Sequence, residues 1–191
     1  MHRFFGRFVI GASALLIAAT AHAQGTNPSG RPFKLGGQLG ASVPMGDFGD
    51  LSNVGYHLGG LIEYKPASLP LGLRGELTYH RNGLKDDIFG DIDGNFSQID
   101  FVGNALVPFG AATSTARPYV IGGLGLYRLK MSAEFEGEEG SDTETKLGLN
   151  FGAGLTFNLS GFETFVETRF HSVFAEGSNM NFIPLSFGFK F

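Results

Sequence analysis

The 191-residue sequence contains no cysteine, which excludes disulfide bonds as a source of stability. Charged residues make up 17% of the chain, below the roughly 25% of an average soluble domain, whereas Gly contributes 30 residues and Phe 20. The formal net charge of −4 argues against a general nucleic-acid-binding protein, which needs a basic surface, so we expect no nucleic-acid partner.

The first 23 residues have the pattern of a secretory signal peptide. Two arginines precede the apolar run FVIGASALLIAA, and the tripeptide AHA at residues 21–23 has the small-residue form of a cleavage site. We therefore expect residues 1–23 to direct export and residues 24–191 to form one domain. The expected mature part contains no continuous apolar run of about 18 residues, so we expect no membrane-spanning helix.

The rest of the chain alternates apolar and polar residues with a period of two. This period is typical of strands that have two unlike faces. Seven segments have a clear facing, which makes about eight strands with the segment described next. In chain order they are residues 33–43, 56–64, 71–80, 98–107, 146–158, 162–171 and 183–191.

The segment RPYVIGGLGLYRL, residues 117–129, reads as a strand whose facing is open. Either Val120, Leu124 and Leu126 point outward, or Tyr119, Ile121 and Tyr127 do. We favour the tyrosines, because they lie eight residues apart, like the two tyrosines of residues 56–64. That spacing fits the aromatic girdles at the two edges of a membrane band.

The connections between the strands alternate in length. The long ones include PMGDFGDLSNVG, RNGLKDDIFGDIDGNF and KMSAEFEGEEGSDTETK, and the short ones include KPASLP, GAATSTA and LSG. Long loops at one end and tight turns at the other are typical of outer-membrane barrels. We predict an all-β fold, a transmembrane antiparallel up-and-down β-barrel of about eight strands. The alternative is a soluble β-sandwich, which is disfavoured by charges in mid-strand and by a last strand that would leave an open edge.

The last residues, IPLSFGFKF, resemble the C-terminal assembly signal of bacterial outer-membrane barrels, in which hydrophobic residues alternate and the chain ends in Phe. Here the signal would comprise Phe187, Phe189 and Phe191. RPYVIGGLGLYRL and FVETRFH are similar to the fifth and seventh strands of the small outer-membrane β-barrel family that includes OmpA- and OmpX-like domains. The resemblance implies a monomeric barrel in the cell outer membrane, surrounded by lipid and lipopolysaccharide. It also implies periplasmic chaperones and the barrel-assembly machinery as partners.

The face opposite the apolar one carries charges in mid-strand. An eight-stranded barrel is just wide enough for side chains to fill it, and an isolated buried charge is very costly. We therefore expect an interior polar network that closes the lumen. Its expected members are Lys34, Glu63, Arg74, Glu76, His80, Asp100, Glu167, Arg169, His171 and Lys190.

Three functions are compatible with this pattern. We favour a structural or surface-interaction barrel that acts through its long acidic loops. The alternatives are a narrow pore or a carrier for small or apolar molecules, as in OmpW-like barrels, and a lipid-modifying enzyme. We expect no enzyme, because His171 and Ser172 are adjacent and face opposite sides of a strand. The lipid A deacylase barrels differ, since their His and Ser share a face.

Two acidic stretches are candidate cation sites. GDIDGN places Asp91, Asp93 and Asn95 at a calcium-like spacing but lacks the full loop and its closing Glu, so we expect a solvated turn. EFEGEEGSDTE, residues 134–144, reads as a solvated loop, although beside anionic lipopolysaccharide it could share divalent cations. We expect no cofactor and no dedicated metal site.

Overall fold

A computed structural model describes residues 33–66, 68–85, 94–111, 114–135, 138–159, 161–175 and 177–191. The expected signal peptide and the aspartates of GDIDGN lie outside these residues. The side chains of residues 133–141, which include most of the acidic run, are also outside the description.

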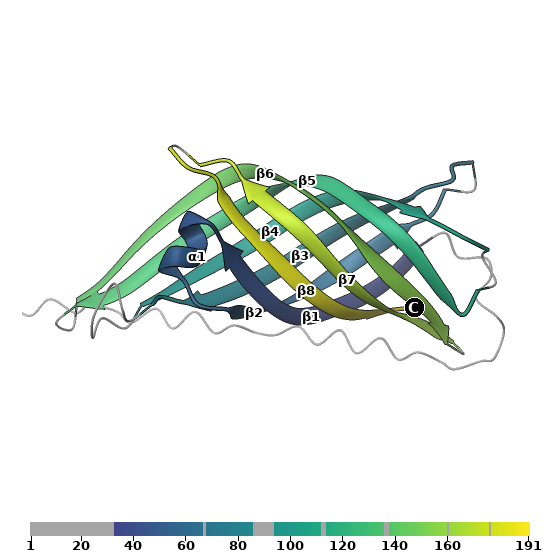
Figure 1. The fold of residues 1–191 in the computed structure, drawn as a ribbon, viewed down its shortest axis with the longest axis horizontal. Coiled ribbons are helices and arrows are strands. Elements are labelled where there is room, and N and C mark those ends of the chain that lie inside the picture. The colour runs from purple at the N-terminus through teal and green to yellow at the C-terminus, as the bar shows by residue number, and fades with distance from the viewer. Residues whose placement is uncertain are drawn as a thin grey trace, which may run out of the picture.

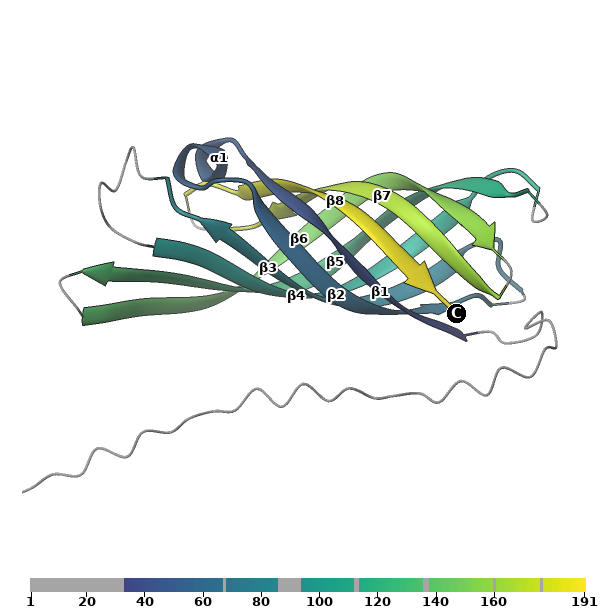
Figure 2. The same cartoon turned by 90° about the horizontal axis from the view of Figure 1, so that it is seen from below.

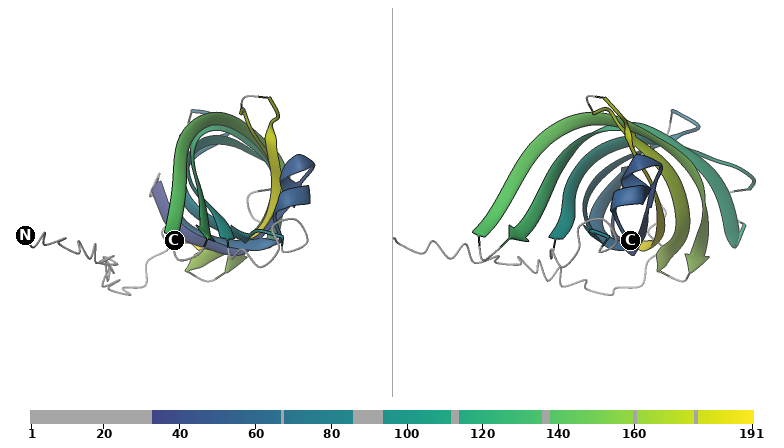
Figure 3. Two further views of the ribbon diagram at one scale, coloured as in Figure 1. Left: turned by 90° about the vertical axis from the view of Figure 1, so that its left-hand side faces the viewer. Right: turned by 60° about the vertical axis from the view of Figure 1, so that its left-hand side comes forward.

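Eight antiparallel strands close into a barrel in the order of the sequence (Figures 1 and 3). Each strand pairs with its neighbours, and the first pairs with the last. The predicted all-β, up-and-down architecture is confirmed. The strands are β1 (Phe33–Met45), β2 (Gly55–Tyr64), β3 (Gly72–Gly83), β4 (Gly94–Pro108), β5 (Ala116–Phe135), β6 (Glu138–Leu159), β7 (Phe162–Val173) and β8 (Met180–Lys190).

The two ends of the barrel differ. At the short-turn end β2 is followed by β3, β4 by β5 and β6 by β7, and β1 begins and β8 ends there. The long-loop end holds the short helix α1 (Asp47–Leu51) and the β5–β6 hairpin (Figure 1). That hairpin extends well beyond the other strands (Figure 2). Among the described residues, no helix is long and apolar enough to span a membrane.

The directions in which the side chains of β3 point distinguish a membrane barrel from a soluble sandwich. Leu77 is 57% exposed, whereas Arg74 is 1% and Glu76 is 3% exposed. The apolar side chains therefore point outward and the charged ones inward, the reverse of a soluble domain. The same outward apolar face runs around the barrel and includes Leu39, Leu58, Phe101, Leu124, Phe151 and Leu185.

The predicted facing of β5 was wrong. Tyr119 and Tyr127 are buried in the lumen, and Leu124 points outward with 69% of its surface exposed. The reason lies in the neighbouring strand β6, where glycines leave room for the rings. A Cβ built on Gly154 would lie 2.5 Å from the Tyr119 ring, and one on Gly148 would lie 2.7 Å from the Tyr127 ring. Both phenol groups find polar partners inside, as buried tyrosines generally do.

The lumen is less uniformly polar than the alternation suggests. Towards the long-loop end, Val102, Tyr127, Val173 and Phe182 form a buried apolar cluster. Phe48 of α1 packs against this cluster together with Leu129 and Met180. A second apolar cluster, formed by Leu106, Tyr119 and Ile121, is also buried. Side chains thus fill the barrel, as expected for eight strands.

Candidate functional site

A cluster of ion pairs, here called the central ion-pair layer, crosses the lumen. It comprises Glu63, Arg74, Glu76, Glu167 and Arg169. Arg74 donates from Nη1 to Glu167 Oε2 at 2.8 Å and from Nη2 to Glu63 Oε2 at 3.1 Å. Arg169 Nη2 lies 2.7 Å from Glu76 Oε2, and its Nε lies 2.8 Å from Glu167 Oε1. Two guanidinium groups and three carboxylates are therefore held together by ion pairs, although Arg169 Nη1 is buried without a hydrogen-bond partner among the described residues.

Aromatic rings enclose this layer. The Tyr119 hydroxyl donates to Glu167 Oε2 at 2.6 Å. The Arg74 guanidinium carbon lies 5.0 Å from the centre of the Phe165 ring and 5.6 Å from that of Tyr119. Such cation–π contacts stabilise a cation that is removed from water. The layer lies between two cavities, one lined by Glu63 and the other by Glu76 and Arg169.

Nearer the long-loop end lies a second polar group, here called the histidine layer: Ser42, His57, His80, Asp100, His171 and Ser186. His80 Nε2 lies 3.1 Å from Asp100 Oδ2, and His80 Nδ1 lies 3.4 Å from Ser42 Oγ. A second pair joins His57 Nε2 and Ser186 Oγ at 3.0 Å. The Tyr127 hydroxyl lies 3.0 Å from His171 Nδ1.

Ser42, His80 and Asp100 are the residue types of a hydrolytic triad. Whether a substrate can reach these residues decides whether they can act as a triad. Ser42 is 1% exposed, and the cavity lined by His80 and Asp100 has a volume of about 10 Å³. That is roughly the space of one water molecule. In this arrangement the trio can hold a water but has no space for an ester or amide substrate beside it.

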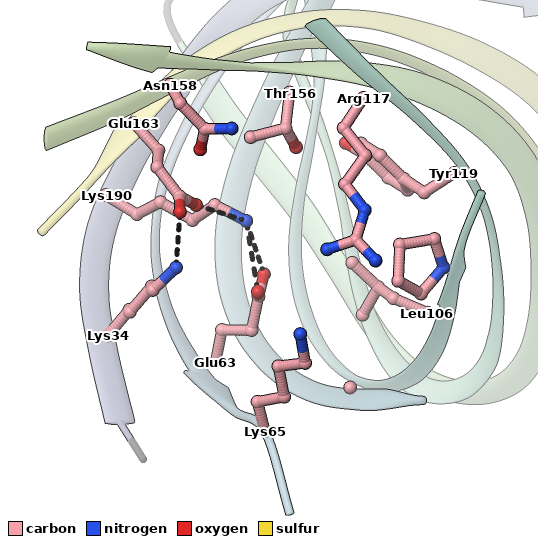
Figure 4. A pocket seen from close by; sticks show the side chains of 12 residues that line it. Lys34, Glu63, Lys65, Leu106, Arg117, Tyr119, Thr156, Asn158, Glu163 and Lys190 are labelled. Atoms are coloured by element: carbon pink, nitrogen blue, oxygen red, sulfur yellow. Dashed lines mark hydrogen bonds and ion pairs between the residues drawn. The ribbon is translucent and has the colours of Figure 1, made fainter. Parts of the chain in front are cut away.

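The third feature, here called the vestibule, is a cavity of about 200 Å³ at the short-turn end. Figure 4 shows its side chains converging from several strands on one space. Lys190 Nζ lies 2.9 Å from Glu63 Oε2 and 3.4 Å from Glu163 Oε2, and Lys34 also pairs with Glu163. Tyr119 and Glu63 line it and also contact Arg74, so the vestibule ends at the central ion-pair layer. Its remaining charged lining residues are Lys65 and Arg117.

The residues predicted for the interior network fall into these groups. Lys34, Glu63 and Lys190 line the vestibule. Glu63 also belongs to the central ion-pair layer, and the other predicted residues of that layer are Arg74, Glu76, Glu167 and Arg169. His80, Asp100 and His171 lie in the histidine layer. Lys34 is the most exposed, with 37% of its side chain accessible.

Sequence reasoning missed several members of these groups: Ser42, His57, Lys65, Arg117, Tyr119, Glu163 and Ser186. Parity within a strand does place Ser42 and His57 on the face opposite the apolar one, but they were not predicted as members of the network. Their partners could not be found this way, because contacts across the lumen depend on the stagger between strands. His171 and Ser172 have opposite parity, and His171 contacts Tyr127 instead.

The predicted assembly residues Phe187, Phe189 and Phe191 lie on the outward face, each about half exposed. The Phe191 backbone completes the pairing with β1, donating to Leu35 O at 2.9 Å and accepting from Leu35 N at 3.0 Å. Within the described ranges, no group of three or more His, Asp or Glu residues could hold a metal ion.

Comparison with solved structures finds the same fold in bacterial surface proteins. Neisserial surface protein A is 19% identical, with a TM-score of 0.62, covering 84% of this chain and 96% of that one. A major outer membrane protein of Thermus thermophilus is 12% identical, with a TM-score of 0.63 and coverage of 84% and 99%. The attachment invasion locus protein Ail of Yersinia pestis, solved with the heparin analogue sucrose octasulfate, is 18% identical, with a TM-score of 0.56 and coverage of 84% and 100%.

A search of curated protein sequences gives no match. The model of the outer membrane protein beta-barrel domain matches residues 10–191, nearly the whole chain. This match agrees with the closed eight-stranded barrel and its outward apolar face. The chain therefore belongs to the outer membrane protein β-barrel domain family.

Proposed function

We propose that this chain is a monomeric surface-interaction barrel of the outer membrane, with its long-loop end outside the cell. Residues 1–23 direct export, and residues 24–191 are delivered by periplasmic chaperones and inserted by the barrel-assembly machinery. The orientation follows the general rule that outer-membrane barrels have short periplasmic turns and longer external loops. Lipid and lipopolysaccharide surround the barrel.

The observation that carries this proposal is an open strand edge on the β5–β6 hairpin. The two strands pair with each other as far as Phe135 and Glu138. Pairing of β6 with β7 begins only at Gly148 and Val173. Residues 138–145 of β6 thus have β5 on one side and no described strand on the other. Such an edge presents backbone donors and acceptors that an extended segment of another protein can pair with.

The charge of the hairpin indicates the kind of partner. By sequence, residues 134–144 contain Glu134, Glu136, Glu138, Glu139, Asp142 and Glu144 and no basic residue. Complementary charge attracts a partner and suppresses wrong ones. The edge therefore fits a basic segment in extended conformation.

The other two candidate functions have less support. A steady pore would need a water path, and the central ion-pair layer separates the vestibule from the small cavity of the histidine layer. An enzyme would need access to Ser42, which is buried. We therefore propose a protein without catalytic activity and without a steady conductance.

A shortened hairpin tests the proposal. Met131 pairs with Asp142, so replacing residues 132–141 by an Asn-Gly turn keeps the register, shortens the open edge by half and removes the acidic residues 134–139. The shortened protein should fold normally, as judged by heat-modifiable migration, and lose binding of a lysine-rich extended peptide to the protein in nanodiscs. Undiminished binding would contradict the proposal.

Two further variants separate the contribution of the acidic side chains to peptide binding from that of the open backbone edge. Thr143→Pro keeps every charge and disturbs the backbone edge, whereas Asp142→Asn with Glu144→Gln keeps the edge and removes charge. We expect both to weaken binding, and the charge variant to lose salt dependence as well. The matched control is Asp50→Asn in α1, an acid at the same end of the barrel, which should have no effect.

A further inference from the structure

We propose that the vestibule at the short-turn end is a binding site for a phosphate-type oxyanion, held between Arg117, Lys65 and Lys190. The site lies at the opposite end of the barrel from the open hairpin edge. It is therefore independent of the surface interaction proposed above.

The first argument is charge. The vestibule is lined by four cations, Lys34, Lys65, Arg117 and Lys190, and by two carboxylates, Glu63 and Glu163. The deeper part of the central ion-pair layer is balanced, with Arg74 and Arg169 against Glu76 and Glu167. The vestibule therefore has a surplus of positive charge in a chain whose formal net charge is −4. A concave site of one sign concentrates ions of the other.

The second argument is pairing. Glu63 is engaged by Lys190 and Arg74, and Glu163 by Lys34 and Lys190. Lys65 and Arg117 form no ion pair with the described residues. Moreover, Arg117 Nε is buried without a hydrogen-bond partner among them. Leaving a buried charged donor unpaired is costly, and an oxyanion in the vestibule would accept from it.

The third argument is geometry. Figure 4 shows the Arg117 guanidinium and the Lys65 ammonium directed into the same space, with Lys190 on the opposite side. Thr156 and Asn158 line the space from β6, and because Asn158 Nδ2 already donates to Ser114 O at 2.9 Å, Thr156 supplies the neutral hydrogen-bonding group. The Tyr119 hydroxyl is already committed to Glu167. Arg117 and Lys65 can thus bind an anion without breaking an ion pair of the central ion-pair layer, while Lys190 adds positive charge and keeps its contacts with Glu63 and Glu163.

The chemistry of these groups selects the ligand. A guanidinium presents a planar fork of donors that matches the oxygens of phosphate, and lysines add compact positive charge. The cavity of about 200 Å³ would accommodate a tetrahedral anion with a few waters, given roughly 30 Å³ for each water. The ligand is therefore a single phosphate group, whether free or at the end of a larger molecule.

Titration of the labelled full-length mature protein in maltoside micelles, which contain no phosphate, tests the proposal. Inorganic phosphate is added at constant ionic strength while the NMR signals of Arg117 Nε–H and of the Thr156 amide are followed. We expect a saturable shift at both sites. Shifts that fail to saturate, or that chloride reproduces at equal ionic strength, would overturn the site.

Variants locate the binding. Arg117→Gln and Lys65→Gln should each weaken phosphate binding about ten-fold or more, because each removes a charge-assisted hydrogen bond. The exposed Lys65 can be changed without risk to the fold, so its variant keeps the test valid if Arg117→Gln assembles poorly. The matched control is Arg128→Gln, an exposed arginine of the same strand at the other end of the barrel. Equal affinity in Arg117→Gln, Lys65→Gln and the control would refute the proposal.

Two further titrations distinguish a phosphate group on a soluble molecule from one on a lipid headgroup. One uses glycerol 3-phosphate in solution, and the other uses nanodiscs of phosphatidylcholine with or without phosphatidic acid. Saturable shifts with the soluble compound assign a diffusible phosphate ester. Shifts only with phosphatidic acid assign a lipid headgroup that reaches the vestibule from the rim. The absence of shifts in both titrations would count against the site.

Discussion

Arg74 of β3 and Glu167 of β7 are joined across the lumen by a hydrogen bond of 2.8 Å, and neither side chain has any exposed surface. The two strands are not neighbours in the barrel. This pair therefore ties opposite walls together, while each partner also contacts other members of the central ion-pair layer.

Breaking this pair should be strongly destabilising. In Glu167→Gln the Arg74 and Arg169 charges lose a shared partner, and we expect the free energy of unfolding to fall by about 3–5 kcal/mol. Urea titration of the protein in micelles, followed by gel migration, measures this. The control Glu144→Gln disturbs the exposed pair with Lys146 and should change stability by no more than about 1 kcal/mol. Equal stability of the two variants would show that the layer does not hold the barrel.

The same layer predicts the behaviour of the lumen towards ions. Planar bilayers containing the wild-type protein should show no single-channel steps above background, because buried ion pairs fill the section between the two cavities. An empty bilayer and a bilayer with a known open porin provide the two references. Regular steps from the wild-type protein would revive the pore alternative.

The packing of tyrosines against glycines can be tested at Gly148. A methyl group there would lie 2.7 Å from the Tyr127 ring and from Ser172 O, so Gly148→Ala should destabilise the protein by about 1–3 kcal/mol. Gly103→Ala is the control, since a Cβ at Gly103 meets nothing within 4 Å. Its effect should stay within about 1 kcal/mol. If the two variants unfold at the same urea concentration, the ring does not occupy that space.

The role of the terminal aromatic residue is a separate prediction. Phe191 is 59% exposed and its backbone pairs with Leu35, a contact that Ala preserves. Phe191→Ala should therefore lower the amount of folded protein in the outer membrane severalfold while leaving the stability of refolded protein nearly unchanged. Phe162→Ala, another outward-facing Phe at the short-turn end, is the control. Equal amounts of heat-modifiable protein in all three strains would contradict an assembly role.

Much of the barrel could be predicted because a strand with one face in lipid must alternate. Leu77 and Glu76 show this clearly, with adjacent residues on opposite faces. Alternation is ambiguous in β5, where both faces carry apolar residues. There the glycines of the neighbouring strand, Gly148 and Gly154, decide which face holds the large rings.

Strand ends were less predictable. The sequence predicts strands over residues 117–129 and 146–158. In the structure β5 extends further, to Phe135, and β6 begins earlier, at Glu138. Beyond the membrane the hairpin needs no apolar face, so its acidic residues resemble those of a solvated loop. The helix α1 is too short to give a periodic signal.

The sequence predicts that charged residues in the lumen pair with residues of opposite charge, but it does not predict which residues form each pair. The pairing of Arg74 with Glu63 follows from adjacent strands, since the two residues are directly opposite in the register. The pairing of Arg74 with Glu167 depends on how the closed sheet is sheared, which no single strand encodes.

The junction between Gly36 of β1 and Lys190 of β8 has a consequence for biogenesis. In the proposed export, β1 emerges first and finds its second neighbour, β8, only after the six strands between them have crossed. Until then its outer edge is unsatisfied and prone to pairing with other chains. If the chain is exported as proposed above, closure of the cylinder follows translocation, and the proposed chaperones have to protect the edge of β1 until β8 has crossed.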